Sequence, residues 1–140
     1  MVGWCRFRRV AEGGAGDEVH LEVPTTPDLL RLVRVVASGL ASRLGFSIEA
    51  IEDVRLAVDE LCWTVASRAG PASTLNVRFV LVDGAFTVEG RLRPGPGAPG
   101  EGGPLSAMSR QILGTLVQDY ALLEPLDGQG AGFRMRTKHT

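Results

Sequence analysis

The sequence has 140 residues, which is enough to bury the core of one domain. Hydrophobic residues make up 44% and charged residues 22%, as in an ordinary soluble globular protein. A formal net charge of −1 argues against a nucleic-acid-binding domain, because such domains carry a basic face, and no apolar run reaches the about 20 residues that span a bilayer.

The cysteines and the first residues predict a cytoplasmic protein without a structural metal. Cys5 and Cys62 are too few for a disulfide framework and lie in no Cys/His cluster. Residues 1–9 carry positive charge but no apolar core follows them, so we expect no signal peptide. The stretch 12–16 is rich in glycine, which predicts a flexible arm over residues 1–16 before a single domain over 17–140.

A strand and a helix are predicted at the start of the domain. Residues 19–23 alternate between apolar and polar, which is typical of a half-buried strand. Thr26, Pro27 and Asp28 form a helix start, and the helix is expected to run to about Leu44. Its buried stripe is predicted to be Leu29, Leu32, Val33, Val36 and Leu40.

The central helix begins after Ser47 and is expected to end before Gly70. Apolar residues recur along it at spacings of three and four: Ile51, Val54, Val58, Leu61 and Val65. Glu60 and Thr64 lie four apart, so they share one face of this helix. A carboxylate and a hydroxyl in this arrangement can serve a pocket, although such pairs more often lie on a solvated helix surface.

A hairpin and a long loop follow the central helix. Residues 75–81 and 86–92 alternate as two strands, and Asp83-Gly84 between them favours a tight turn. Nine of the eleven residues in 94–104 are Gly or Pro, which excludes a regular element there.

The last elements are a third helix and two strands. The helix is predicted over about 105–118, with its inward face made of Met108, Ile112, Leu116 and Leu113. Residues 120–124 and 132–137 have strand patterns. Hairpins between half-polar strands imply a mainly antiparallel sheet, and we predict a two-layer α/β sandwich whose sheet is covered on one face by three helices.

The central helix carries a motif of a known family. Its sequence Arg-Leu-Ala-Val-Asp-Glu-Leu-Cys-Trp-Thr-Val-Ala-Ser resembles the first nucleotide-binding box of the bacterial anti-sigma factor/serine-protein kinase family. These proteins have the GHKL fold of histidine kinases, gyrase and Hsp90. The family motif is Leu-Ala-Val-x-Glu, with Asn four residues later. The resemblance implies that Glu60 is the general base, and Thr64 replaces the Asn that binds magnesium, which leaves it as a weak Mg²⁺ candidate.

The first glycine box of the family, Asp-x-Gly-x-Gly, corresponds to residues 93–97. Gly95 and Gly97 are present, and the resemblance implies that their backbone approaches the nucleotide. Arg93 replaces the Asp that accepts a hydrogen bond from the adenine amino group. A guanidinium donates hydrogen bonds and accepts none, so this substitution weakens adenine recognition.

The second glycine box is expected near the start of the third helix. The register that best fits the helix places Met108-Ser109-Arg110 there, and a looser register uses Gly102-Gly103. Arg110 is the candidate phosphate-binding cation. Together these substitutions predict a degenerate site for ATP and Mg²⁺.

The resemblance implies a cytoplasmic anti-sigma-type regulator that binds a sigma factor, a STAS-domain anti-anti-sigma factor, or both. It also implies a homodimer, whereas the net charge and the lack of a long apolar run predict no nucleic acid or membrane partner. The first helix and the open sheet face are the predicted partner surfaces. Two alternatives stay open: an active ATP-dependent serine/threonine protein kinase with Glu60 as base, and an α/β domain with an unrelated ligand or scaffold role.

Overall fold

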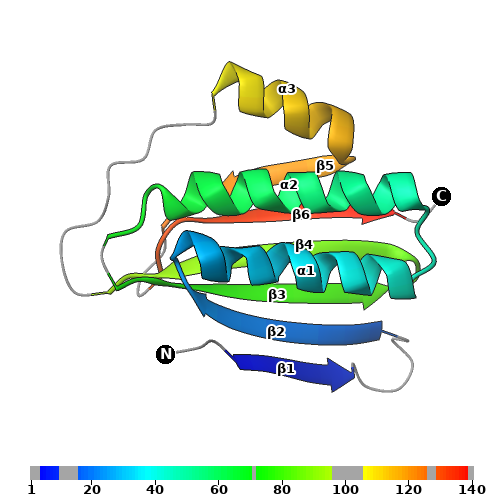
Figure 1. The fold of residues 1–140 in the computed structure, drawn as a ribbon, viewed down its shortest axis with the longest axis horizontal. Helices are drawn as coiled ribbons and strands as arrows, with labels where there is room; N and C mark the ends of the chain where they lie inside the picture. Colours follow the sequence, from blue (N-terminus) through cyan, green and yellow to red (C-terminus); the bar gives the residue numbers. More distant parts are fainter. Residues whose placement is uncertain (1–3, 10–15, 71, 96–105, 126–128, 139–140) are drawn as a thin grey trace.

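The computed structural model describes residues 4–9, 16–70, 72–95, 106–125 and 129–138. They form six strands and three helices in two layers (Figure 1). In chain order the elements are β1 (Trp4–Arg9), β2 (Gly16–Pro24), α1 (Pro27–Arg43), α2 (Ile48–Ala66), β3 (Thr74–Val82), β4 (Ala85–Arg93), α3 (Ala107–Leu116), β5 (Asp119–Leu123) and β6 (Gly132–Lys138).

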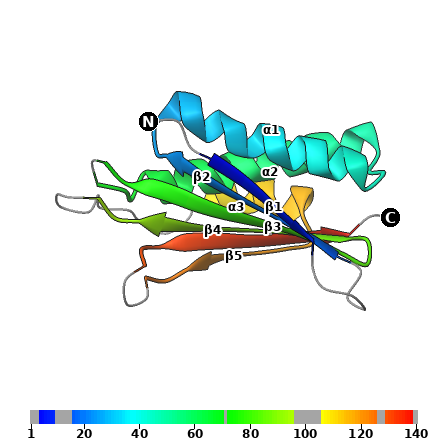
Figure 2. The ribbon, with the colours of Figure 1, turned by 90° about the horizontal axis from the view of Figure 1, so that it is seen from below.

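The strands form one antiparallel sheet in the order β1-β2-β3-β4-β6-β5. All three helices lie on one face of it, as Figure 2 shows from the side. The predicted two-layer α/β sandwich is therefore confirmed. Asp83 and Gly84 have φ values of 50° and 73°, the positive pair that a tight hairpin between β3 and β4 requires.

The predicted flexible arm is wrong for residues 4–9. They form β1, which pairs antiparallel with β2 so that Trp4 lies opposite Glu22 and Arg9 opposite Asp17. The free backbone groups along the outer edge of β2 offer this segment hydrogen bonds that no local sequence pattern reveals. Residues 10–15 lie outside the described part of the chain.

The core lies between the sheet and the helices. Alternate residues of β2, β3, β4 and β6 are buried toward the helices, as the strand periodicity predicted. α2 contributes the most to this core, with buried residues Val54, Ala57, Val58, Leu61, Cys62 and Val65. Burial raises the pKa of the Cys62 thiol, so this side chain acts as a small hydrophobic residue.

The inward faces predicted for two helices are right only in part: Val33 and Leu113 are buried, and Val36, Leu40 and Leu116 pack against the core. α1 buries Leu30, Val33, Ala37 and Ala41, whereas Leu32 is exposed. The alanines let α1 approach the sheet closely, and the many apolar residues of this helix did not define one face. In α3 only Leu113 is fully buried, while Met108 is 72% exposed and Ile112 38%. α3 therefore packs on α2 along one narrow line.

Candidate functional site: two sides of helix α2

Glu60 lies on the side of α2 that faces α3. Its carboxylate accepts a hydrogen bond from the hydroxyl of Ser109, in the first turn of α3. Ser106 is the N-cap of α3: its Oγ accepts from the backbone N–H of Ser109 and donates to Ser109 Oγ, both at 3.0 Å. A chain of hydroxyl hydrogen bonds thus runs from Ser106 through Ser109 to Glu60, and it holds the start of α3 against α2.

Thr64 lies one turn after Glu60 on α2, as the spacing predicted. Its hydroxyl donates to the backbone carbonyl of Glu60 at 2.8 Å. This bond within the helix is a common alternative for threonine and uses the only proton of the hydroxyl. Thr64 as a magnesium ligand stays a prediction, and among the described residues no cluster of three His, Cys, Asp or Glu side chains could hold a metal.

The first glycine box lies at the end of β4. Arg93 is the last residue of this strand, pairs with Thr74 of β3 and is exposed. The backbone N–H of Gly95 donates to the buried hydroxyl of Ser73 at 3.3 Å, and Ser73 in turn donates to the carbonyl of Gly70 at 2.8 Å. The Gly95 N–H that the resemblance assigns to the nucleotide is therefore already bonded to the protein.

The other predicted site residues are only partly placed. Gly97 and the pair Gly102-Gly103 lie outside the described residues. Arg110 is exposed in the first half of α3, and its backbone carbonyl accepts from the Tyr120 hydroxyl at 3.4 Å. No hydrogen bond within the described chain joins Arg93 or Arg110 to Glu60.

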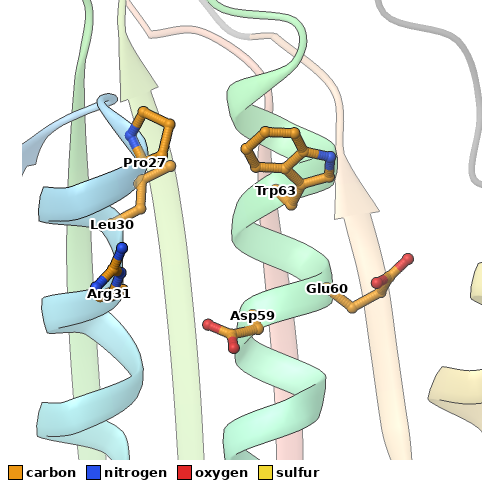
Figure 3. Close-up of a pocket in the computed structure, with 6 residues that line it drawn as sticks. All are labelled: Pro27, Leu30, Arg31, Asp59, Glu60 and Trp63. Atoms are coloured by element: carbon orange, nitrogen blue, oxygen red, sulfur yellow. The ribbon is translucent and has the colours of Figure 1, made fainter.

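The opposite side of α2 faces α1 and forms a groove of about 260 Å³. Figure 3 shows Asp59 directed toward α1 and Glu60 directed away from it. The groove is lined by Pro27, Leu30, Arg31, Asp59, Glu60 and Trp63. Arg34 Nη1 lies 2.8 Å from Asp59 Oδ2, which links α1 to α2 beside the groove.

Sequence reasoning missed both the Ser109 contact and this groove. Ser109 was identified only as part of a glycine-box register, because its contact with Glu60 joins residues that lie far apart in the chain. Trp63 gave a usable signal: it lies four residues after Asp59 and seven after Leu56, on the polar face of an amphipathic helix. It is 61% exposed in the structure.

The comparisons with known proteins agree with the motif on α2. Residues 23–121 match the family described as "Histidine kinase-like ATPase domain". The chain is 34% identical over 68 residues to the serine-protein kinase RsbW of Bacillus licheniformis, covering 46% of this chain and 42% of that protein. It is 50% identical over 44 residues to RsbW of Listeria monocytogenes serotype 4a, covering 31% of this chain and 28% of that protein.

These alignments span less than half the length of each curated relative. The family match is broader, since it runs from the end of β2 into β5 and includes α1, α2 and α3. It thus takes in Glu60, Thr64 and the segment of the first glycine box. The chain belongs to the histidine kinase-like ATPase domain family.

Proposed function

We propose that this chain is an anti-sigma-type transcription regulator that acts by binding a protein partner and has a degenerate ATP site. The observation that carries the proposal is the Ser109 hydroxyl on the carboxylate of Glu60. The group that the resemblance makes the general base is thereby bonded to the chain itself. The proposed partner is a sigma factor, a STAS-domain anti-anti-sigma factor, or both.

Three substitutions support loss of tight nucleotide binding. Arg93 offers donors where the adenine amino group needs an acceptor. Thr64 is shorter than the expected Asn, so its oxygen reaches less far into the site. The register Met108-Ser109-Arg110 replaces the second glycine box. An unmet polar contact in a buried site costs about 1–3 kcal/mol, so several such losses together would weaken nucleotide binding strongly.

The second candidate is an ATP-dependent serine/threonine protein kinase. Here Glu60 would be the general base toward a substrate hydroxyl, so the hydrogen bond from Ser109 would first have to be released. In this mechanism a partner's serine takes the place of Ser109. ATP and Mg²⁺ would be held by Thr64, Gly95, Gly97 and Arg110. The curated relatives are named serine-protein kinases, which supports this candidate by analogy.

The assembly and location are also proposals. We propose a homodimer that works in the cytoplasm and contacts neither nucleic acid nor membrane. In the part of the chain that the structure describes, no helix has the length and apolar character needed to cross a bilayer. Light scattering of the purified protein tests the homodimer directly, because a mass of one chain in solution contradicts it.

A thermal shift experiment separates the two candidates. A ligand at about a hundred times its Kd adds about 2.7 kcal/mol, which raises the Tm of a domain of this size by about 10 °C. We expect no shift with millimolar Mg-ATP or Mg-ADP, and a recovered shift in the triple variant Arg93→Asp, Thr64→Asn, Ser109→Gly. A full shift in the unmodified protein, with γ-phosphate transfer to a STAS partner, would establish the kinase instead.

The protein-binding part of the proposal needs its own test. Tagged protein is used to capture partners from host lysate, and each recovered sigma factor or STAS protein is then purified and titrated against the chain. We expect at least one of them to bind directly. If purified sigma factors and STAS proteins of the host all fail to bind, the regulator assignment is wrong.

A further inference from the structure

Among residues 17–70, 72–95, 106–125 and 129–138, every exposed large hydrophobic side chain lies on a helix. These residues are Leu32 and Val35 on α1, Ile48, Leu56 and Trp63 on α2, and Met108 and Ile112 on α3. In the same ranges, strands β2 to β6 contribute none. Exposed apolar residues gathered on one face mark a surface that meets another molecule. The outer surface of the helix layer is therefore the face to search for a partner site.

Leu56 and Trp63 form the centre of this surface. They lie seven residues apart, so they fall on one line along α2, and they are 48% and 61% exposed. Figure 3 shows Trp63 on α2 across from Pro27 and Leu30 of α1, at the groove between the two helices. An exposed indole beside an apolar groove has the composition of an interface anchor.

The charges around these two residues select the kind of partner. α2 carries one basic residue, Arg55, and five acidic residues: Glu49, Glu52, Asp53, Asp59 and Glu60. Arg55 neutralises Glu52 at 2.8 Å, and Arg34 of α1 neutralises Asp59 at the same distance. Glu49 and Asp53 form no ion pair within the described residues. Arg31 of α1 adds one positive charge to the groove, so the excess of acidic residues lies on α2 itself. The ridge of α2 is thus apolar with acidic flanks, and it attracts basic side chains.

We propose that the ridge of α2 and the α1–α2 groove bind a basic amphipathic helix of a protein partner. α2 has 19 residues and is about 28 Å long, so it offers a straight docking edge. A helix whose apolar residues recur at i, i+3, i+4 and i+7 can contact Leu56 and Trp63 together. Its basic residues then face the acids of α2. This proposal rests on the protein-binding function proposed above and adds the surface and the partner's chemistry.

The experiment uses two synthetic helical peptides of about 20 residues with identical leucine faces. One has lysine and the other glutamate on its polar face, and each carries a fluorescent label for polarisation. We expect the lysine peptide to bind at least tenfold more tightly than the glutamate peptide, and its affinity to fall with added salt. Equal binding of both peptides would overturn the charge argument.

Variants then locate the binding site. Trp63→Ala is expected to lower the affinity of the protein for the lysine peptide at least tenfold. Ile48→Ala is the matched control, because Ile48 is an exposed apolar residue of the same helix that does not line the groove. The chain has two tryptophans, so in a Trp4→Phe background the emission of Trp63 should shift on binding. Unchanged affinity in Trp63→Ala, measured on protein with an unchanged Tm, would overturn the proposal.

The same variant separates this proposal from the proposed function. A purified sigma factor or STAS partner is titrated against the unmodified protein and against Trp63→Ala. A tenfold loss supports the docking surface, whereas equal binding refutes it and leaves the regulator function standing. If no such partner binds but the lysine peptide binds at Trp63, the surface stands and the assignment of partner class fails.

Discussion

The two long sides of α2 use neighbouring carboxylates in different ways. Glu60 turns toward α3, where the Ser109 hydroxyl bonds it. Asp59 turns toward α1, where Arg34 neutralises it beside an open groove. On the first side, the side chains of Glu60 and Thr64 form hydrogen bonds within the protein. On the second side, the indole of Trp63 is exposed.

This difference follows from helix geometry and has a consequence for function. Consecutive helical residues are about 100° apart, so adjacent residues serve separate surfaces. Substitutions on one side are therefore expected to leave the other intact. The proposed loss of nucleotide contacts beside Glu60 is thus compatible with the proposed protein-binding surface beside Trp63. The following predictions test whether the two sides are independent.

Truncating a core side chain beneath both sides of α2 should have the largest effect on stability. Leu61 follows Glu60 and is fully buried, so Leu61→Ala is expected to lower the free energy of unfolding by about 2–5 kcal/mol. Leu56→Ala on the same helix is the control, because Leu56 is 48% exposed and should cost less than about 1 kcal/mol. Urea denaturation measures both. Similar losses in the two variants would contradict the burial of Leu61.

The next largest effect tests the α3 side alone. Ser106→Ala removes the N-cap of α3 and should lower the free energy of unfolding by about 1 kcal/mol. Hydrogen exchange should increase in α3 and stay unchanged in α1. Ser47→Ala, which removes the corresponding cap of α2, serves as the comparison. Faster exchange in α1 after Ser106→Ala would show that the two sides are coupled.

A smaller effect tests the α1 side. Arg34 and Asp59 are about one third exposed, so solvent screens their ion pair, and a double-mutant cycle should give a coupling of less than about 1 kcal/mol. Added salt should reduce it. The readout is thermal unfolding of Arg34→Ala, Asp59→Ala and the double variant. A coupling above about 2 kcal/mol would mean that this pair locks α1 to α2.

The smallest effect on stability is expected from an ion pair on the open face of the sheet. Breaking this pair should disturb neither side of α2. A hydrogen bond from Arg78, 2.6 Å from Glu18 Oε1, lowers the pKa of Glu18 below its ordinary value of 4.5. A lowered pKa in the folded state means that this pair stabilises the protein above about pH 4.5, and the stabilisation is lost as pH falls through the folded pKa. Arg78 is half exposed, so the contribution should stay below about 1 kcal/mol.

Glu18→Gln checks this pH dependence. Its stability should fall less steeply than that of the unmodified protein between pH 5 and pH 3, as measured by urea denaturation at about half-unit steps. Glu22→Gln on the same strand is the control, because Glu22 has no ion pair within the described residues. An identical pH profile for Glu18→Gln and the unmodified protein would show that the Arg78 bond adds no stability.

The sequence was sufficient to predict those elements whose residues follow a strict local pattern. Alternation in β3 and β4 and the Asp83-Gly84 pair predicted the hairpin, and the spacing of Glu60 and Thr64 predicted their shared helix face. Patterns were insufficient where tertiary packing decided the outcome. β1 depends on the free edge of β2, and α3 leaves Met108 and Ile112 exposed because it packs mainly on α2.

The site was partly predictable for the same reason. Glu60 and Thr64 are local to one helix, whereas the Ser109 contact joins α2 to a helix beyond a Gly/Pro-rich loop. No spacing rule connects residues across such a loop. The groove also needed the structure, because it depends on how α1 packs beside α2.

The sheet order has a consequence for how the chain is made. β6 lies between β4 and β5 in the sheet but follows both of them in the chain, and it supplies the buried Phe133 and Met135. The ring of Phe133 covers Gly90 of β4, where a Cβ would come within 2.5 Å of the ring. Until β6 emerges from the ribosome, β4 remains an open edge that can pair with other chains. We therefore expect nascent chains that end before β6 to depend on chaperones.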